Sequence, residues 1–368
     1  MKIVIAPDSY KNCLSANKVA KIISDGIHTI YPEAETILLP LADGGEGTTQ
    51  AIIQATGGKI YTCEVHDSLM RKIQGFYGII ETQATAVVEI AAASGIELLK
   101  NSELDILNAS SYGSGEIINF ILENHSIKKL FIGLGGSATN DGGTGLLQAL
   151  GAEFFDYNGN KIPQGISGKD LINIAQVKTD KLNKKLQNIE IIVGCDVKNP
   201  LTGENGASAI FGPQKGATPE NVKFLDKGLA NFRKSTPELP GDGAAGGIAF
   251  ALRNYLDAKI ISGAEALLTT CDFEKKIQNA TIVITGEGKS DLQTVEGKLC
   301  YIVSKIAAQH GLPTALISGA IKDTQILQKY FSHLIQVTPE DMAIDEAIKS
   351  APELLKNAAI TLAIKLNK

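Results

Sequence analysis

Residues 133–145 read Gly133-Leu-Gly-Gly-Ser-Ala-Thr-Asn-Asp-Gly-Gly-Thr-Gly145, and they stand between two apolar runs. The preceding run, Lys129-Leu-Phe-Ile132, is typical of a buried strand, and Leu146-Leu-Gln-Ala-Leu150 predicts the start of a helix. Such a loop exposes backbone N–H groups and the positive end of a helix dipole to an anion. Its hydroxyl, amide and carboxylate groups favour a site that binds a phosphate together with a metal ion or a reacting hydroxyl. The alternative is a turn that carries these polar side chains but binds no ligand.

Three further segments combine Gly with Asp, Glu or Lys close to an apolar run, which favours the phosphate interpretation. They are Leu41-Ala-Asp-Gly-Gly-Glu-Gly-Thr48, the pair Asp196-Val-Lys-Asn-Pro-Leu-Thr-Gly203 and Phe211-Gly-Pro-Gln-Lys-Gly216, and Thr285-Gly-Glu-Gly-Lys-Ser-Asp-Leu-Gln-Thr294.

Together with the opening Met1-Lys-Ile-Val-Ile-Ala-Pro-Asp-Ser-Tyr-Lys11, these segments resemble the glycerate kinase family of bacterial type, from Lys2 to about Ala320. The strings that carry the resemblance are Ala-Asp-Gly-Gly-Glu-Gly-Thr (42–48), Gly-Gly-Ser-Ala-Thr-Asn-Asp-Gly-Gly (135–143), Phe-Gly-Pro-Gln-Lys-Gly-Ala (211–217) and Ile-Thr-Gly-Glu-Gly (284–288). Asn12-Cys13 and Lys289-Ser290 depart from the family's more usual residues.

The resemblance implies an ATP-dependent, Mg²⁺-requiring kinase of D-glycerate. The expected product is 2-phosphoglycerate rather than 3-phosphoglycerate, in the breakdown of glyoxylate or sugar acids. Two alternatives stay open, a kinase of another small hydroxy acid and a non-catalytic regulator that binds sugar acids.

The composition is that of an ordinary globular protein. The 368 residues suffice for two domains, 44% are hydrophobic and 20% are charged, and the net charge of -5 does not favour nucleic acid as a partner. The five cysteines form no Cys-x-x-Cys pair, so zinc and disulfide frameworks are not expected. A signal peptide and a membrane span are not expected either. We expect a cytoplasmic enzyme and leave its oligomeric state open, a homodimer included.

Strand-like and helical patterns alternate at both ends of the chain, which predicts a parallel, doubly wound sheet. Strands are expected at 2–6, 36–39, 281–285, 314–318 and 333–337, and helices from Ser15, at 49–55, at 301–310 and from about Pro352 to Leu366. Between residues 60 and 90 three strand-like runs follow with few helical residues, which predicts antiparallel or mixed pairing. Alternation returns with a helix at 116–123 and strands at 130–134 and 189–195.

These changes of pattern predict two α/β domains. Residues 1–58 and 280–368 form a discontinuous, Rossmann-like parallel-sheet lobe, and this lobe is interrupted by a larger inserted α/β lobe, 59–279, which carries the glycine-rich loop.

The common nucleotide motifs are absent. Val283 stands where a Walker A loop ending at Lys289-Ser290 needs its first glycine. Gly241-Asp-Gly-Ala-Ala-Gly246 matches Gly-x-Gly-x-x-Gly, but it follows a proline-rich loop rather than a strand. The small apolar residues after it favour a close-packed helix start, and a contact with a substrate or nucleotide stays open.

Phosphoryl transfer needs cradled phosphates, a metal ion and an aimed hydroxyl. For the nucleotide we single out the loop and two later charged residues: Gly135, Gly136, Ser137, Thr139, Asn140, Gly142, Gly143, Glu287 and Lys298. Asp196 and Asp291 are the expected metal ligands, because Mg²⁺ takes hard oxygen ligands. The expected catalytic residues are Asp8, Lys11, Asp43, Asp141 and Lys215. For the lysines the alternative is solvation, and for Asp8 and Asp43 it is the capping of turns.

The acceptor is expected to contact Ser9, Gly44, Glu46 and Arg71. The planar guanidinium of Arg71 suits a carboxylate, with a surface salt bridge as the alternative. Because these residues and the glycine-rich loop fall on different lobes, we expect the site in a cleft between the domains that closes on its ligands.

Overall fold

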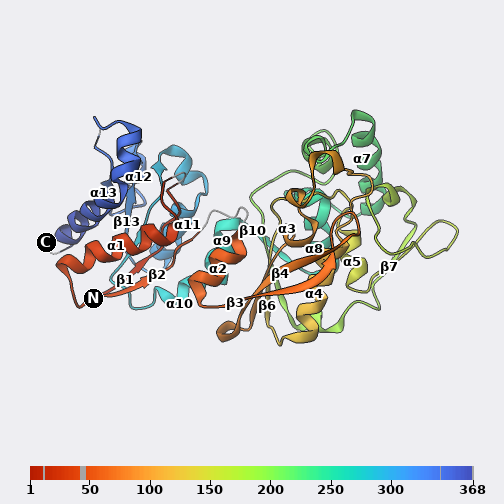
Figure 1. Cartoon of the computed structure of the whole chain (residues 1–368), viewed down its shortest axis with the longest axis horizontal. Helices are drawn as coiled ribbons and strands as arrows, with labels where there is room; N and C mark the ends of the chain where they lie inside the picture. Colours follow the sequence, from red (N-terminus) through yellow and green to blue (C-terminus); the bar gives the residue numbers. More distant parts are fainter. Residues whose placement is uncertain (11–12, 42–46, 340, 367–368) are drawn as a thin grey trace. The chain divides into compact units, whose positions relative to one another are not determined.

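A computed structural model of the chain describes residues 1–10, 13–41, 47–339 and 341–366 (Figure 1). Its contacts divide the chain into two units: unit 1 comprises Met1–Asp43, Gln54–Thr56 and Leu267–Lys368, and unit 2 comprises Gly44–Ile53 and Gly57–Ala266. Each unit is built on its own main β-sheet. The predicted fold class is confirmed, because a parallel-sheet unit made from both ends of the chain is interrupted by a larger α/β unit.

The limits of the units differ from the predicted domain boundaries at two helices, α2 (Thr48–Thr56) and α9 (Gly263–Thr270). Most of α2 groups with unit 2 because it packs on that unit's sheet. A Cβ placed on Gly78 would lie 2.5 Å from Ile53 Cγ1 and 3.1 Å from Thr49 Cγ2. The chain returns to unit 1 at Leu267, earlier than the predicted residue 280.

Unit 1 contains a five-stranded sheet in the order β15-β13-β11-β1-β2, and every neighbouring pair is parallel. Its strands are β1 (Lys2–Ile5), β2 (Glu35–Leu38), β11 (Ile282–Thr285), β13 (Thr314–Ser318) and β15 (His333–Gln336), with a small pair β12 (Lys289–Ser290) and β14 (Ala320–Ile321). The strands expected from apolar runs at both chain ends are thus confirmed. The inner strands are mostly apolar and almost entirely buried because helices cover both faces of the sheet.

The helices of unit 1 are α1 (Ala16–Ile30), α10 (Phe273–Lys276), α11 (Leu299–Gln309), α12 (Thr324–Leu327) and α13 (Ile344–Lys365). As predicted, Ser15 caps α1 by accepting a hydrogen bond from the backbone N–H of Lys18 at 3.5 Å. Helices α1 and α13 pack side by side on one face (Figure 1). The last helix begins well before Pro352, the predicted start, because burial of Ala347 and Ala351 favours a helix through the proline.

Unit 2 contains a six-stranded sheet in the order β10-β9-β6-β5-β4-β3. Its strands are β3 (Lys59–His66), β4 (Lys72–Ile80), β5 (Thr85–Glu89), β6 (Lys129–Gly133), β9 (Glu190–Gly194) and β10 (Lys259–Ile261), beside a separate pair β7 (Glu153–Phe155) and β8 (Gln176–Lys178). Within the six-stranded sheet the pairs β3–β4 and β4–β5 are antiparallel and the other three pairs are parallel, so the predicted mixed sheet is confirmed. The separate pair β7–β8 is antiparallel.

The helices of unit 2 are α3 (Ala91–Ser94), α4 (Tyr112–Asn124), α5 (Thr144–Ala149), α6 (Ala207–Phe211), α7 (Pro219–Arg233) and α8 (Ile248–Leu256). Short 3₁₀ turns across the chain are η1 (Glu81–Gln83), η2 (Ile96–Leu98), η3 (Asn101–Glu103), η4 (Gly168–Asn173), η5 (Lys184–Asn188), η6 (Pro213–Lys215), η7 (Ala244–Gly247) and η8 (Leu292–Glu296).

The carboxyl ends of adjacent parallel strands bring chemically rich loops together within each unit. In unit 2, Gly133 and Gly194 are register partners at the ends of β6 and β9, so the loops that follow start side by side. In unit 1, β2 lies on one side of β1, and β11, β13 and β15 follow on the other. The order therefore reverses between β1 and β11, which is where ligands bind in open α/β sheets.

Candidate active site

The glycine-rich loop after β6 divides into two halves that do different work. The first half, residues 134–137, forms part of a cavity wall. Gly136 has φ +69°, and its carbonyl accepts a hydrogen bond from Ile96 N at 2.8 Å, while Ala138 N donates to Ser94 O at 2.8 Å. These bonds fix the turn, and Gly135, Gly136 and Ser137 line the cavity. Their contact with phosphate stays a prediction.

The second half of the loop is buried and serves packing, which corrects three predicted roles. Asp141 is 0% exposed, and its carboxylate accepts hydrogen bonds from Ser111 N, Ser111 Oγ, Gly143 N and Gly145 N at 2.6–3.2 Å. A carboxylate enclosed in this way cannot touch a substrate, so it positions the loop. Burial raises the pKa of Asp141, and these hydrogen bonds oppose the rise.

Gly142 and Gly143 were predicted to approach phosphate, but they face helices instead. Both have positive φ, +63° and +74°. A Cβ on Gly143 would lie 2.6 Å from Ala251 Cβ, and one on Gly142 would lie 3.0 Å from Phe232 Cδ1. Helix α5, which follows, has only one and a half turns, and its start is enclosed by this packing. The glycines are required here by close contact with α7 and α8.

Thr139 and Asn140 lie between the two halves and are fully buried. Asn140 Nδ2 donates to Ser208 Oγ at 2.9 Å, whereas Asn140 Oδ1 and Thr139 Oγ1 have no hydrogen-bond partner among the described residues. Buried polar atoms without a partner are costly, so they mark a place where water or a ligand atom would be accommodated.

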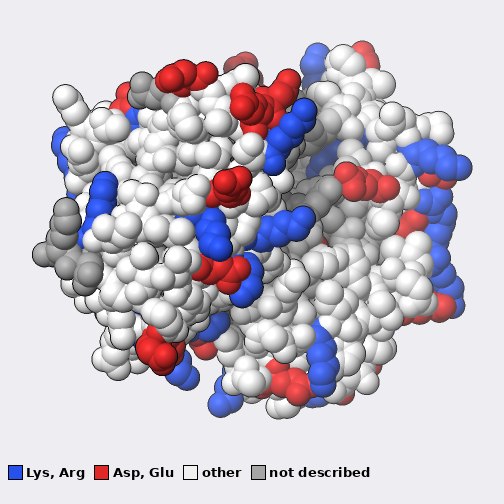
Figure 2. All heavy atoms as spheres, turned by 60° about the vertical axis from the view of Figure 1, so that its left-hand side comes forward, with Lys and Arg blue, Asp and Glu red and all other residues white. Residues whose placement is uncertain are grey.

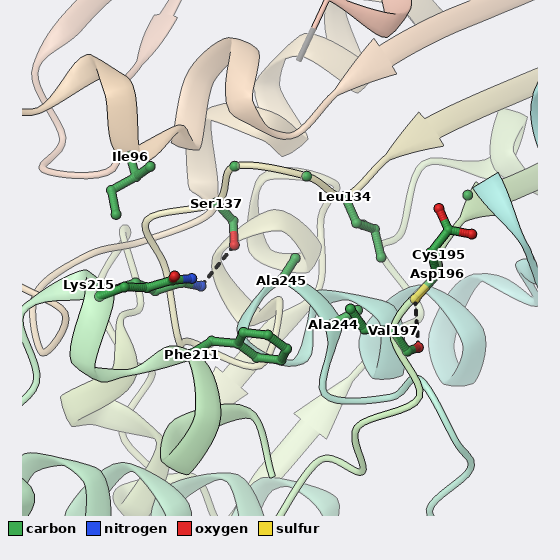
Figure 3. Close-up of a pocket in the computed structure, with 14 residues that line it drawn as sticks. Ile96, Leu134, Ser137, Cys195, Asp196, Val197, Phe211, Lys215, Ala244 and Ala245 are labelled. Atoms are coloured by element: carbon green, nitrogen blue, oxygen red, sulfur yellow. Dashed lines mark hydrogen bonds between the residues drawn. The ribbon is translucent and has the colours of Figure 1, made fainter. Parts of the chain in front are cut away.

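The match to Gly-x-Gly-x-x-Gly at 241–246 is explained by packing against the same loop. Gly142 N donates to Gly246 O at 2.9 Å, and a Cβ on Gly246 would lie only 2.1 Å from Thr139 O. The predicted close-packed helix start is therefore confirmed. Ala244 and Ala245 of η7 nevertheless reach the cavity wall (Figure 3).

A cavity of about 430 Å³ opens at the carboxyl ends of β6 and β9, within unit 2 (Figure 3). It is lined by Ile96, Leu134, Gly135, Gly136, Ser137, Gly194, Cys195, Asp196, Val197, Phe211, Gln214, Lys215, Ala244 and Ala245. Aliphatic groups and the Phe211 ring dominate this wall, with a few polar groups among them. That composition and size are typical of a site for a small organic ligand.

Lys215 is the cation among the residues that line this cavity. Its side chain is 3% exposed, and Nζ donates to Ser137 Oγ at 2.9 Å and to Thr139 O at 2.7 Å (Figure 3). Burial lowers the pKa of Lys215 to about 7, with a smaller opposing effect from Asp141. The alternative of a solvated surface lysine is wrong. The turn η6 carries Lys215 inward because Pro213 starts it and Gly216, at φ +90°, ends it.

Asp196 lies on the cavity wall next to Cys195, immediately after β9. Its Oδ1 accepts a hydrogen bond from Gly263 N at 2.8 Å, and the side chain is exposed. Asp291 belongs to unit 1, where it caps η8 and pairs with Lys289 at 2.8 Å. Among the residues described, no three His, Cys, Asp or Glu side chains gather as a metal cluster. A magnesium ion held by one carboxylate together with phosphates and water would need no such cluster.

A second group of predicted residues meets at the switch point of unit 1. Asp8 N donates to Gly286 O at 2.8 Å, and Ser9 N donates to Asp8 Oδ1 at 2.5 Å, so the loops after β1 and β11 are joined. Glu287 is 8% exposed and pairs with Lys298 at 3.6 Å. We infer that Glu287 holds these loops in place. Asp8 and Ser9 are half-buried in the same group of loops.

Sequence reasoning missed the hydroxyl groups around Glu287. Its Oε1 accepts hydrogen bonds from Thr294 Oγ1 at 2.7 Å and Ser290 Oγ at 3.0 Å, and Ser290 in turn bonds to Ser318 Oγ at 2.8 Å. Ser290 and Thr294 stand in the quoted 285–294 segment, which was the available signal, whereas Ser318 reaches the group only through the pairing of β13 with β11.

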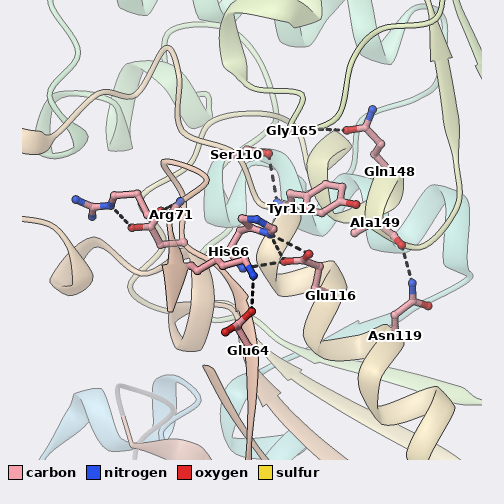
Figure 4. A network of polar contacts seen from close by, with 12 residues as sticks. Glu64, His66, Arg71, Ser110, Tyr112, Glu116, Asn119, Gln148, Ala149 and Gly165 are labelled. Atoms are coloured by element: carbon pink, nitrogen blue, oxygen red, sulfur yellow. Dashed lines mark hydrogen bonds and ion pairs between the residues drawn. The ribbon is translucent and has the colours of Figure 1, made fainter. Parts of the chain in front are cut away.

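Arg71 forms ion pairs with protein carboxylates, and its contact with the substrate stays a prediction. Its Nε lies 2.6 Å from Asp67 Oδ2, and one terminal nitrogen lies 2.8 Å from Glu103 Oε1. Both contacts raise the pKa of Arg71. The pKa of Glu103 is lowered by the hydrogen bond from the backbone N–H of Lys100 and, next, by the one from Arg71. Figure 4 shows Arg71 in a polar network near the His66–Glu116 pair. The salt-bridge alternative is confirmed.

Four predicted residues lie outside the described part of the chain. They are Lys11, Asp43, Gly44 and Glu46.

Comparison with known proteins decides the family. The model of the glycerate kinase family matches residues 3–367. The chain belongs to the glycerate kinase family. It is 39% identical over 380 aligned residues to "Glycerate kinase" of Bacillus subtilis (strain 168), covering 100% of this chain and 99% of that protein. It is 41% identical over 378 aligned residues to "Glycerate 2-kinase" of Escherichia coli (strain K12), covering 99% and 98%.

A crystal structure from Salmonella typhimurium LT2, described as a candidate glycerate kinase 2, is similar to the whole fold. The TM-score is 0.85 at 41% identity, over 100% of this chain and 98% of that one. The predictions of the family and of a phosphotransferase are thus confirmed. The cavity and the switch-point loops are therefore parts of a glycerate kinase family enzyme.

One face of this family member is of mixed charge (Figure 2). On the face seen in Figure 2, Lys and Arg side chains alternate with Asp and Glu side chains, in keeping with the net charge of -5. Within the described ranges, no helix is both long and apolar enough to span a membrane.

Proposed function

We propose that this chain catalyses ATP-dependent phosphorylation of D-glycerate, with 2-phosphoglycerate favoured over 3-phosphoglycerate. The observation that carries the proposal is the family match over residues 3–367, together with 41% identity to a protein named glycerate 2-kinase. The buried cation beside a glycine-rich turn supports it, because a transferring phosphoryl group needs positive charge and close backbone approach.

On this proposal the nucleotide occupies the cavity of unit 2. Its phosphates would face the Gly135–Ser137 turn and Lys215, and its apolar parts would contact the Phe211 ring. Asp196, exposed on the same wall, would hold Mg²⁺ with the phosphates and water. The metal ion, when bound, would neutralise charge on the phosphates.

The acceptor would bind at the loops of unit 1, where Asp8 and Ser9 stand at the switch point. A half-buried carboxylate such as Asp8 can take the proton of the attacking hydroxyl. From the sequence, Asp43 is an equal candidate for that role. That the unit 1 loop residues and the unit 2 cavity residues act together in one cleft stays a prediction.

The test is turnover of purified protein with ATP, Mg²⁺ and D-glycerate, followed as ADP release, with ³¹P NMR to distinguish the 2-phosphate from the 3-phosphate. Lys215→Met should lower kcat/KM at least about tenfold, the loss expected for one charge-assisted hydrogen bond. Lys223→Met is the matched control, because Lys223 is exposed on α7. Formation of no new phosphate monoester would exclude the proposed activity.

A further inference from the structure

Lys215 is a buried cation without an acidic partner in the described part of the chain. Its two hydrogen-bond acceptors, Ser137 Oγ and Thr139 O, are both uncharged, and no described carboxylate lies within ion-pair distance. An ammonium group has three donors, so one remains for another acceptor. Burying a charge without a counter-charge is costly unless the group neutralises or a partner arrives.

The charge of Asp141 opposes part of the effect of burial on the pKa of Lys215. The titratable groups on the segments around the cavity nevertheless form no ion pair with Lys215 among the described residues. They are Glu97, Asp141, Cys195, Asp196 and Asp242. The carboxylate of Asp141 accepts hydrogen bonds from the Ser111 hydroxyl and from three backbone N–H groups, and Asp242 pairs with Arg253 at 2.7 Å. Glu97 is exposed, and Figure 3 shows Cys195 and Asp196 across the cavity from Lys215.

We propose that Lys215 receives an oxyanion of a ligand in this cavity, and that binding of the anion draws a proton onto its amine. This inference rests on the proposed function in treating the cavity as the ligand site, and it adds a coupling between ligand binding and protonation. On the placement proposed above, this oxyanion is a nucleotide phosphate. The carboxylate of the acceptor acid is the other source of the same chemistry, and the experiment separates the two.

The state of the free protein supports the coupling. Burial brings the pKa of Lys215 to about 7, so the amine is largely neutral at pH 8. An anion within hydrogen-bond distance favours the charged form and raises that pKa again. Linkage then requires the uptake of about one proton per ligand bound at pH 8. Proton uptake is much smaller at pH 6, because the amine already carries its proton there.

The test is isothermal titration calorimetry of the full chain with ADP, and separately with D-glycerate, in buffers of different ionisation enthalpy. At pH 8 ADP and glycerate are fully ionised, since the second ionisation of a phosphate monoester lies near ~6. Proton uptake must then come from the protein. The ligand whose binding is accompanied by proton uptake is the one that contacts Lys215. No uptake with either ligand, or no binding of either, would overturn the proposal without any variant.

Two variants assign the proton to Lys215. Lys215→Met should bind at least about tenfold more weakly and take up no proton. Lys215→Arg should bind without uptake, because guanidinium is charged at every pH used. Uptake that persists in either folded variant would place the proton elsewhere and refute the inference. Coupled uptake without phosphoryl transfer to glycerate would refute the proposed function alone, and turnover without uptake would refute the inference alone.

Discussion

Replacement of Asp141 by Asn separates a role in chemistry from a role in folding. Asp141 Oδ2 accepts hydrogen bonds from Ser111 N, Ser111 Oγ and Gly145 N, while Oδ1 accepts one from Gly143 N. An Asn side chain can keep its carbonyl oxygen at the Oδ2 position. Its amide group would then face the N–H of Gly143, which is also a donor.

The expected cost follows from that geometry. Leaving the buried Gly143 N–H unpaired costs about 1–3 kcal/mol, and three hydrogen bonds lose their charge assistance. We expect Asp141→Asn to lower the free energy of unfolding by about 2–4 kcal/mol. Turnover by the molecules that remain folded should change little, because Asp141 is 0% exposed and cannot reach a substrate.

The assay is urea unfolding followed by far-UV circular dichroism, with kcat measured at a temperature where the variant is folded. Asp180→Asn is the control, because Asp180 is exposed in the same unit and should leave both quantities unchanged. A normal urea midpoint with a hundredfold loss of kcat would refute this reasoning and restore the catalytic role expected from the sequence.

Three further predictions follow from other contacts. Gly143→Ala should lower the free energy of unfolding by about 2–5 kcal/mol, from positive φ and the clash with Ala251, and an unchanged urea midpoint would contradict the packing. Arg71→Met should alter KM for glycerate less than about twofold, since its guanidinium already binds protein carboxylates, and a tenfold rise would argue for contact with the acid. For Lys215, the folded pKa of about 7 lies below the reference value of 10.5, so the unfolded chain binds more protons between these values. Wild-type stability should therefore rise with pH from 7 to 9 relative to Lys215→Met, by up to about 1.4 kcal/mol per unit in urea titrations, and a constant difference would contradict burial of the amine.

The sequence by itself determined the class of fold and the family. Apolar runs such as those at β1, β6 and β13 predict buried strands, because a strand covered on both faces is apolar along its length. Ser15 and the apolar spacing after it predict α1 for equally local reasons. Short runs with weak periodicity were not predicted from sequence, among them β7, β8 and β10, and neither was α7.

For the site, the sequence supplied the residue types and only part of their roles. Lys215 was expected to act in a site, and the structure buries it in the wall of a cavity. The division of the glycine-rich loop into a cavity wall and a packing half was not foreseeable, since Gly136 and Gly143 look alike in the sequence and both have positive φ. They differ in what surrounds them: Gly136 lines the cavity, whereas Gly143 packs against Ala251.

Tertiary structure decided those neighbours. Asp141 became a buried organiser because Ser111, thirty positions earlier in the chain, brings its hydroxyl and N–H to the carboxylate. Arg71 forms ion pairs with Asp67 and Glu103, two partners that the sequence did not indicate. The pKa of Lys215 is lowered because η6 buries its amine beside Ser137. Local sequence fixes which groups are present, whereas burial and charge depend on contacts between distant segments, and these two quantities determine whether a polar residue binds, positions or packs.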